Sequence, residues 1–522
     1  MIIKVFDGYD CIGGNKILVA DKHNDGFMLD FGLNFSKWFL FFEEYLKPRS
    51  GKILHDLLKL NMIPRINIYR KDLQPPEFDE NTKISFLFLS HAHADHCGMI
   101  GLIDESLPLL VTGETFAIMK AGTQIRQDVW DELYPKKRKK VGHNDDVLRH
   151  DILVAERNVK NRRKISLLSS STQKKILEPD FFEEIDAKNL WKDELYIQPV
   201  YHSIIGSAGL IARVDDWWVA YTGDFRTGPE SVEEENFWLE NLGEKRVQLS
   251  KRSDMFFDLL KNKKPLLLIV EGTRTTRQSE KDTTEWDVFQ NVLNLLQNTN
   301  KLVIADFSMK HLERLMTFLK VAIMTERTLV VMPKDYAYLE TMGEVEPLWK
   351  LNDTEKNHIK IYHPAKSSFI GLEKKVVEKA KKDEILLLPD DINHKPSLYI
   401  LAAGYWDIPN ILDLNEDVLE NCLYIHSTSE AYSEEQQIDF RRFKNWIDRF
   451  SIKSFGFGVD SDGELRFSKQ FHASGHVSAE KLSSIINTVS PDLILPVHTL
   501  DRSWFVERWG RKVINGNKFH IS

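Results

Sequence analysis

Three histidines and an aspartate lie close together in the segment HAHADH, residues 91–96. Neutral imidazole nitrogens and carboxylate oxygens are ligands that zinc prefers, and catalytic zinc keeps one position open for water. His91 and His93 can share one ion. Asp95 and His96 point elsewhere and suit a second ion about 3.5–4 Å away, the separation used in two-metal hydrolysis. The segment therefore predicts a two-metal site, whereas ordinary histidines on a polar loop are the alternative.

Further ligands are expected just after other apolar runs, because strand ends hold side chains rigidly. The cluster itself follows the run ISFLFLS. His202 follows LYIQPVY, Asp224 follows WWVAYTG, and His498 follows LILPV. A carboxylate at Asp224 can bridge both ions and lower the pKa of a shared water towards neutrality. The expected cofactors are two divalent ions, Zn²⁺ or alternatively Mn²⁺, since such ligands accept both metals.

The order of apolar runs predicts an α/β chain. Strand-like runs occur at 16–20 and 26–29, and again at 195–200, 209–214 and 217–222. From residue 265 onward, strands and helices alternate, which indicates a parallel sheet with crossover helices. The expected strands are 266–270, 302–305, 329–332, 385–388, 398–402 and 423–426, with helices such as 284–297 and 311–324.

Two other segments complete this organisation. A charged stretch from about 122 to 195 has little strand character and is interpreted as an insertion that follows a helix at 115–121. Near the end, a helix at 478–487 and a strand at 493–496 lead to His498.

Composition limits the class of protein. A chain of 522 residues with 42% hydrophobic content is long enough for two or three domains with proper cores. Cys11, Cys97 and Cys422 are too few and too scattered for a disulfide framework or a cysteine-ligated zinc module, and Cys97 is expected to be buried. Without an apolar run near the 18 residues of a membrane span, a cytoplasmic protein that does not contact membranes is expected.

The charge is uneven along the chain. The net charge of −8 argues against a globally basic surface, yet PKKRKK at 135–140 and VKNRRK at 159–164 are strongly basic. Such patches can bind phosphates. A solvated basic loop and, for the first run, a nuclear import signal are the alternatives.

A family resemblance rests on several of these residues. In family order, Asp30, HAHADH, His202 and TGDF at 222–225 resemble the metallo-β-lactamase fold superfamily. Within it, the chain looks like the β-CASP nucleases, the branch that contains ribonuclease J and the pre-mRNA 3′-end cleavage endonuclease. Three further motifs match that branch, with Glu271 in LLLIVEGT, His476 in HASGHVS and His498 in LILPVHTL.

The resemblance implies a fold and its division into domains. A metallo-β-lactamase αββα sandwich would comprise residues 1–275, with the insertion at about 122–195, and residues 468–522. A β-CASP α/β domain of parallel-sheet type would be inserted at 276–467 and would cover the site as a cap.

The resemblance also implies roles for the site residues. One ion would be held by His91, His93 and His202, and the other by Asp95, His96 and His498, with Asp224 bridging. Asp30 would orient a ligand imidazole. His476 would be the general acid for the leaving oxygen, and Glu271 would position it. His472, Ser474 and Gly475 are interpreted as a phosphate-binding turn, because small residues expose backbone N–H groups to an anion.

These roles imply a two-metal ribonuclease that acts on single-stranded RNA and leaves 5′-phosphate and 3′-hydroxyl ends, as similar enzymes do. RNA is preferred because the DNA-repair group of the branch usually has valine where this chain has His498. A DNA nuclease of the same branch and a nucleic-acid-binding pseudoenzyme are the alternatives. The sequence leaves open whether cleavage is exonucleolytic or endonucleolytic. The oligomeric state also stays open, with a homodimer as one option, because ribonuclease J members usually continue into a further domain after the third motif.

Overall fold

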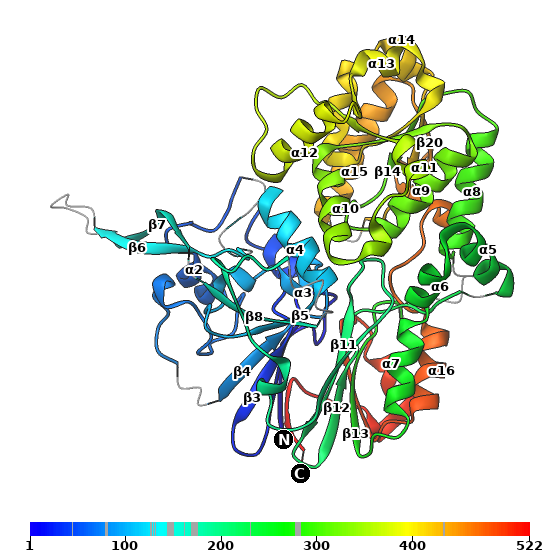
Figure 1. Ribbon diagram of the computed structural model, residues 1–522. Coiled ribbons are helices and arrows are strands. Elements are labelled where there is room, and N and C mark those ends of the chain that lie inside the picture. Colours follow the sequence, from blue (N-terminus) through cyan, green and yellow to red (C-terminus); the bar gives the residue numbers. More distant parts are fainter. Residues whose placement is uncertain are drawn as a thin grey trace.

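The computed structural model describes residues 1–43, 45–78, 82–125, 128, 130, 132–142, 151–160, 162–168, 176–229, 231–276, 283–431 and 434–521. It is a mixed α/β structure in which a third sheet lies above two others (Figure 1). We call residues 283–467 the cap and the remaining described residues the two-sheet part.

The first sheet of the two-sheet part has eight described strands, in the order β24-β1-β2-β3-β4-β5-β8-β9. The pairs from β24 to β3 are antiparallel, and the pairs from β3 to β9 are parallel. The strands are β1 (Ile2–Asp7), β2 (Lys16–Ala20), β3 (Asp25–Leu29), β4 (Lys83–Phe88), β5 (Leu109–Thr112), β8 (Arg163–Leu168), β9 (Phe182–Glu184) and β24 (Lys518–His520).

The second sheet has the order β10-β11-β12-β13-β23. Strands β10 to β12 pair antiparallel, whereas β12, β13 and β23 pair parallel. Strand β13 reads LLLIVE and is buried at every position, as expected for a strand covered on both faces. The bounds are β10 (Leu195–Pro199), β11 (Ala208–Val214), β12 (Trp217–Tyr221), β13 (Leu266–Glu271) and β23 (Leu493–Val497).

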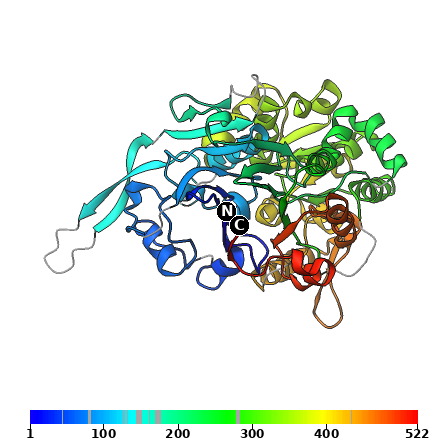
Figure 2. The same cartoon turned by 90° about the horizontal axis from the view of Figure 1, so that it is seen from below.

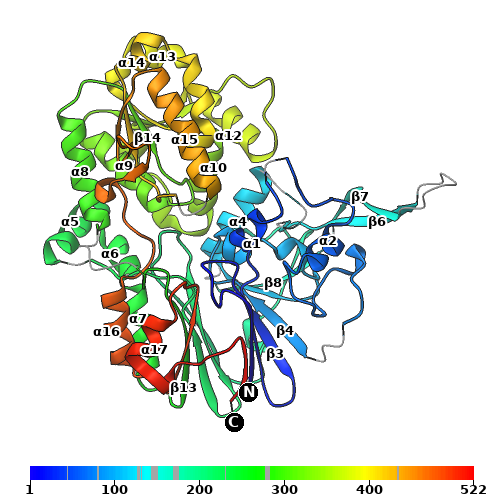
Figure 3. The ribbon, with the colours of Figure 1, turned by 180° about the vertical axis from the view of Figure 1, so that it is seen from behind.

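Apolar side chains hold the two sheets face to face. Val19 and Phe27 of the first sheet share a buried cluster with Tyr221 and Ile269 of the second. Helices cover both outer faces, as the views from the front and from behind show (Figures 1 and 3). The helices of the two-sheet part are α1 (Phe35–Phe39), α2 (Ile53–Lys59), α3 (Ala94–Cys97), α4 (Gly113–Ile125), α5 (Val232–Leu242), α6 (Glu244–Ser250), α7 (Arg252–Leu260), α16 (Ala479–Val489) and α17 (Ser503–Trp509). The layers are therefore helix, sheet, sheet and helix.

The cap contains a sheet whose described strand pairs are all parallel, in the order β17-β16-β15-β18-β14-β19-β20. The parallel sheet predicted from alternating strands and helices is thus confirmed. Its strands are β14 (Val303–Asp306), β15 (Thr328–Val331), β16 (Ile359–Tyr362), β17 (Leu386–Leu387), β18 (Tyr399–Ala402), β19 (Leu423–His426) and β20 (Lys453–Phe455). The short pair β21 (Phe457–Val459) and β22 (Leu465–Phe467) follows.

Helices cover both faces of the cap sheet. Successive strand residues face opposite sides, so Val303 packs in one buried cluster and Ile304 in another. Helix α8 begins at a capping box, in which Thr284 and Asp287 bond each other's backbone N–H. The helices are α8 (Glu285–Gln297), α9 (Leu312–Met324), α10 (Pro333–Val345), α11 (Asp353–Asn357), α12 (Gly371–Lys382), α13 (Pro389–His394), α14 (Glu416–Glu420) and α15 (Glu434–Arg449). Within the described chain, no helix is both long and apolar enough to span a membrane.

The expectation of little strand character at 122–195 is wrong for the described part of this stretch. Strands β8 and β9 lie within this stretch and belong to the first sheet, where β8 pairs with β5. Strand β8 was missed because it begins with the charged residue Arg163. In the structure this side chain is fully buried and donates to the carbonyl oxygens of Leu133 and Ile100. Residues 126–127, 129, 131, 143–150, 161 and 169–175 lie outside the described residues.

One part of the stretch does stand apart from the sheets. Strands β6 (Lys136–Gly142) and β7 (Asp151–Lys160) form an antiparallel pair of their own. Figures 1 and 2 show this pair projecting from the two-sheet part. The basic run 135–140 therefore lies largely on a projecting hairpin.

Two further expectations need correction. The strand predicted at 266–270 is β13, which belongs to the second sheet and not to the cap sheet. Strands β16 and β20 were missed, because both are short and β16 carries a lysine in the middle of IKIY.

Candidate metal centre

The segment HAHADH lies where β4 has ended and the single-turn helix α3 begins. The carboxyl ends of parallel strands meet at one edge of a sheet, which brings residues from separate strands together. Asp30 follows β3, Asp224 follows β12, and His498 follows β23. The centre therefore lies at the strand ends of both sheets, and Lys310 of the cap reaches it by donating to the carbonyl oxygen of Ala92 at 3.4 Å.

Three histidines form the first group of candidate ligands. The Nε2 atom of His91 lies 3.0 Å from Nδ1 of His93, and Nε2 of His202 lies 3.3 Å from the same Nδ1 atom. Burial lowers the pKa of His91 and His202 well below the usual value and that of His93 to about 4. The three imidazoles are therefore neutral at neutral pH, which is the form that binds a metal.

A second group combines one carboxylate with two histidines. The Nε2 atom of His498 lies 3.1 Å from Oδ2 of Asp95, and Nε2 of His96 lies 3.8 Å from the same oxygen. Burial would raise the pKa of Asp95, but the imidazoles of His96 and His498 outweigh burial and lower it. Asp95 is thus a carboxylate, ready to act as a ligand.

Asp224 lies between the two groups. Its Oδ2 atom is 3.8 Å from Nε2 of His91, 3.1 Å from Nε2 of His96 and 3.7 Å from Nε2 of His498. One oxygen of a single carboxylate therefore approaches histidines of both groups, which is the geometry of a bridging ligand.

Among the described residues, the buried Oδ1 of Asp224 has no hydrogen-bond partner, and the buried Nε2 of His96 has only its close contact with Oδ2 of Asp224. Buried polar groups normally have partners, so these two atoms call for a group that the protein itself does not supply. The carboxylates of Asp224 and Asp95 outweigh burial and raise the pKa of His96. In the absence of a cation, a proton on His96 compensates the local negative charge. The donor set therefore fits divalent cations.

The far side of His96 is held by a buried hydrogen-bond network. Nδ1 of His96 lies 2.7 Å from Oδ2 of Asp30, which also accepts hydrogen bonds from the hydroxyl groups of Tyr221 at 2.6 Å and Ser90 at 2.7 Å. The backbone N–H of Ser90 donates to the other oxygen of Asp30 at 2.7 Å. This network directs Nε2 of His96 at the centre and fixes the tautomer. Ser90 and Tyr221 were not anticipated, and their position beside the motifs is the only sequence signal for them.

The two other strand-end histidines are held in the same way. Nδ1 of His202 donates to the carbonyl oxygen of Gly475 at 2.5 Å. Nδ1 of His498 lies 2.8 Å from the Oγ1 atom of Thr273. Thr273 was also missed by the sequence reasoning, although it lies two residues after Glu271. In each case the Nε2 atom is left to face the other ligands.

His476 and Glu271 form a pair beside Asp224. Nδ1 of His476 lies 2.9 Å from Oε2 of Glu271 and 3.8 Å from Oδ2 of Asp224. Burial would lower the pKa of His476, but these two carboxylates outweigh burial and raise it. The side chain of His476 is 22% exposed, whereas those of His91, His96 and His498 are buried. His476 is thus a histidine of the centre that a substrate can reach and that two carboxylates favour in its protonated form.

The segment 472–475 is divided between two environments. The close approach of Gly475 to His202 requires a glycine, since a Cβ atom here would lie 2.9 Å from the His202 ring. Ser474 accepts a hydrogen bond from the backbone N–H of His476 at 3.2 Å. His472 lies near Arg314, and burial followed by this guanidinium lowers its pKa to about 3. The structure therefore brings Ser474 and Gly475, but not His472, against the centre.

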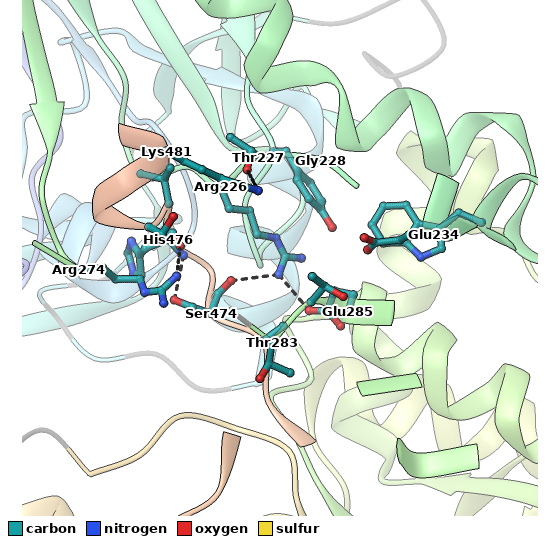
Figure 4. A pocket seen from close by; sticks show the side chains of 16 residues that line it. Arg226, Thr227, Gly228, Glu234, Arg274, Thr283, Glu285, Ser474, His476 and Lys481 are labelled. Carbon is teal, nitrogen blue, oxygen red and sulfur yellow. Dashed lines mark hydrogen bonds and ion pairs between the residues drawn. The ribbon is translucent and has the colours of Figure 1, made fainter. Parts of the chain in front are cut away.

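A cleft with a volume of about 50 Å³ adjoins His476. Figure 4 shows Arg226, Arg274 and Lys481 among the side chains that line it, together with Glu285. Arg274 donates to the carbonyl oxygen of His476 at 3.3 Å. The cleft therefore presents Arg274 and Lys481 next to a partly exposed histidine of the centre.

A second buried cluster of ionisable groups lies behind this cleft, and we call it the arginine–glutamate cluster. Its members are Arg226 of the two-sheet part and Glu285, His311, Glu313 and Arg314 of the cap. Arg226 donates to Glu285 at 3.0 Å and also contacts Glu313. Arg314 donates twice to Glu285, at 2.9 and 3.0 Å. This cluster ties the cap to the two-sheet part.

Comparisons with known proteins identify a solved structure with a similar fold. No family model and no curated protein matches the chain. A solved structure described as a protein of unknown function from Enterococcus faecalis V583 is similar over 99% of this chain and 97% of its own chain, with a TM-score of 0.62 and 20% identity. At this identity the likeness shows the fold alone, so the chain is a mixed α/β protein whose architecture also occurs in that structure.

Proposed function

We propose that the chain is a metal-dependent phosphodiesterase of the metallo-β-lactamase fold, from its β-CASP branch, and that it cleaves RNA. The layered two-sheet part with the ligand residues at its strand ends supports the fold assignment. The inserted parallel sheet of the cap supports the branch. One observation carries the chemical proposal, which is that Asp224 lies within 4 Å of both ligand groups and of His476.

Each ligand group has a task in the proposed reaction. His91, His93 and His202 would hold one divalent ion, and Asp95, His96 and His498 the other, with Asp224 shared. When bound, two such ions supply Lewis acidity towards phosphoryl oxygens and lower the pKa of a water nucleophile. Asp30 keeps His96 oriented through its 2.7 Å contact.

His476 and Glu271 would handle the proton of the leaving group. Glu271 accepts from Nδ1 of His476, which leaves Nε2 as the atom able to donate a proton. The raised pKa of His476 favours its protonated form, which the departing 3′ oxygen requires. A backbone N–H from Phe225 at 2.8 Å and the hydroxyl of Thr273 at 2.5 Å hold Glu271 in place.

RNA is the substrate that we favour. Arg274 and Lys481, which line the cleft beside His476, suit a phosphate neighbouring the one that is cleaved. A single strand can follow such a cleft, because cationic side chains bind its phosphates while its bases remain free to stack. The histidine at position 498, where the DNA-repair group of the β-CASP branch usually has valine, supports RNA over DNA.

The test is degradation of a 5′-monophosphorylated, 3′-labelled single-stranded RNA beside the DNA of the same sequence, with Zn²⁺ or Mn²⁺ added. Wild type is compared with Asp95→Ala and His476→Ala. The control is His55→Ala, which removes a histidine whose side chain is 65% exposed. We expect RNA to be cut by wild type and by the control, and both other variants to be inactive.

The other outcomes separate the alternatives. Cleavage of DNA alone would make the chain a β-CASP DNA nuclease. RNA binding without cleavage, together with a lack of bound metal, would make it a nucleic-acid-binding pseudoenzyme. The product ladder distinguishes exonucleolytic from endonucleolytic cleavage.

A further inference from the structure

Lys310 is a cap residue that reaches the candidate metal centre. It lies on the turn between β14 and α9, at the carboxyl edge of the cap sheet. Its ammonium group donates to the carbonyl oxygen of Ala92 at 3.4 Å, and Ala92 stands between His91 and His93 in the sequence. A cationic side chain of the cap therefore lies beside the segment that carries two candidate ligands of the two-sheet part.

The turn that carries Lys310 is fixed by the core of the cap. The ring of Phe307 stacks on that of Phe318 in α9, with centroids 4.8 Å apart, and both side chains are buried. The backbone N–H of His311 donates to the carbonyl oxygen of Ser308 at 2.9 Å, which closes the turn. Lys310 is thus presented to the centre from a rigid element, as a group that acts on a substrate must be.

The charge of Lys310 has no counter-charge within the described chain. The hydrogen-bond partner of its ammonium group there is the carbonyl oxygen of Ala92, and no described carboxylate pairs with it. An ammonium group has three N–H donors, so two remain for another acceptor. The residue is also partly exposed, unlike the fully buried His91. Lys310 can therefore bind an acceptor that comes from outside the protein.

The positive charge of Lys310 acts on the centre from the side of His93. Burial has the largest effect on the pKa of His93 and lowers it, and the Lys310 ammonium lowers it further. When the ligand groups hold divalent cations, an ammonium group on this side is repelled unless an anion lies between them. A phosphate fits this place, because a lysine binds phosphate through charge-assisted hydrogen bonds.

We propose that Lys310 is a catalytic residue of the phosphodiesterase and that its ammonium group contacts a non-bridging oxygen of the phosphate that is cleaved. This inference rests on the proposed function and adds a group that the cap contributes to the same site. In the reaction, the oxygen of water bonds to phosphorus while the bond from phosphorus to the 3′ oxygen breaks. His476 gives its proton to the 3′ oxygen, and the water releases one proton to solvent. Lys310 keeps its proton and stabilises the charge that develops on the non-bridging oxygen.

The first measurement compares kcat and KM for a single-stranded RNA in Lys310→Met and Lys310→Arg. The control is Lys381→Met, which removes an exposed charge of α12. We expect Lys310→Met to lower kcat about 100-fold and to change KM by less than about threefold, because the contact strengthens in the transition state. Lys310→Arg should recover part of kcat, since it restores the charge. Lys381→Met should match wild type.

The second measurement does not depend on cleavage. Titration calorimetry of the manganese-loaded full chain with inorganic phosphate as the probe reports the phosphate contact directly. We expect the Kd for phosphate to rise about tenfold in Lys310→Met and by less than about twofold in Lys381→Met. The metal content and the thermal unfolding midpoint should be the same in both variants, because Lys310 contacts a backbone carbonyl oxygen and no ligand atom.

The outcomes separate this inference from the proposed function. Equal kcat and equal phosphate affinity in Lys310→Met and Lys381→Met would overturn the inference, whereas cleavage of RNA by both would uphold the nuclease. If wild type left RNA intact while its phosphate affinity depended on Lys310, the nuclease would be excluded and the phosphate contact supported. Loss of metal in Lys310→Met alone would show that the contact with Ala92 is structural, and it would overturn the inference.

Discussion

The histidine centre and the arginine–glutamate cluster are both buried groups of ionisable side chains, yet they balance their charge differently. In the arginine–glutamate cluster, Glu285 accepts hydrogen bonds from Arg226 and Arg314, so the carboxylate is compensated by guanidinium groups. In the histidine centre, Asp224 and Asp95 are contacted by imidazoles, which are neutral when they bind a metal.

This difference decides which cluster can bind a cation. Glu285, His311 and Glu313 are close enough together to resemble a metal site. However, two arginines already lie against Glu285, and a divalent ion would have to displace or oppose them. Proximity of histidines and carboxylates therefore does not by itself indicate a metal site. The cationic side chains beside them must also be considered. The cluster without arginines is the candidate metal centre, and the one with arginines connects the two parts.

The largest expected effect comes from Asp224→Asn. This change keeps the shape of the side chain but removes the charge that both ligand groups share. We expect nuclease activity to fall by about 10³-fold and the bound zinc or manganese, measured by mass spectrometry, to fall with it. Glu285→Gln should leave the metal content unchanged. Equal metal loss in both variants would contradict the distinction between the clusters.

A large loss of stability is expected from Glu285→Gln. The change leaves Arg226 and Arg314 buried without their shared carboxylate, which should lower the free energy of unfolding by about 3–5 kcal/mol. Urea unfolding followed by circular dichroism measures it. The control is Glu378→Gln, because Glu378 is 66% exposed and its pair with Lys374 should contribute less than about 1 kcal/mol. Similar midpoints for the two variants would show that the buried cluster has no special role.

A change in pH dependence is expected from Glu271→Gln. As the proposed acid, His476 must be protonated, so activity should fall as the pH rises through its pKa. Glu271 raises this pKa, and its neutral replacement should therefore move the alkaline limb of kcat to lower pH. The measurement is kcat against pH with saturating RNA. If the alkaline limb of kcat did not move, the proton for the leaving group would have to come from a group other than His476.

The smallest effect is expected from two exposed lysines of the projecting hairpin. Lys137 and Lys139 of β6 are exposed, and changing both to Gln should weaken RNA binding only a few fold at low salt. If both contact phosphates, the slope of log K against log salt should decrease in magnitude by about 1.4. Fluorescence anisotropy over a range of salt concentrations tests this. An unchanged slope would leave the basic run 135–140 as a solvated hairpin.

Much of the fold was predictable because its strands are apolar and its helices follow them in turn. The alternation after residue 265 predicted the parallel cap sheet, and strands such as β19 begin and end where expected. Strand β8 was missed because its leading residue, Arg163, is charged and yet fully buried. A guanidinium that donates to backbone carbonyl oxygens can lie in a core, and no local pattern signals such long-range contacts.

The sequence predicted the candidate ligand residues but not the residues that orient them. Residues such as His202 and His498 follow apolar runs, and the structure brings both to the same strand ends as HAHADH. The residues that orient them could not be found in this way. Thr273 and Ser90 are ordinary side chains whose roles depend on a partner's position in space. The arginine–glutamate cluster joins residues of separate parts, and a single sequence does not reveal such pairing.

The position of β23 in the second sheet has a consequence for the order in which the molecule is made. This strand pairs with β13, and the whole cap is synthesised between the two. While the ribosome is still making the cap, the new chain carries HAHADH but has neither His476 nor His498. Every copy therefore passes through a period of synthesis in which its histidine centre is incomplete. The centre matures late, after the cap beside it has already been made.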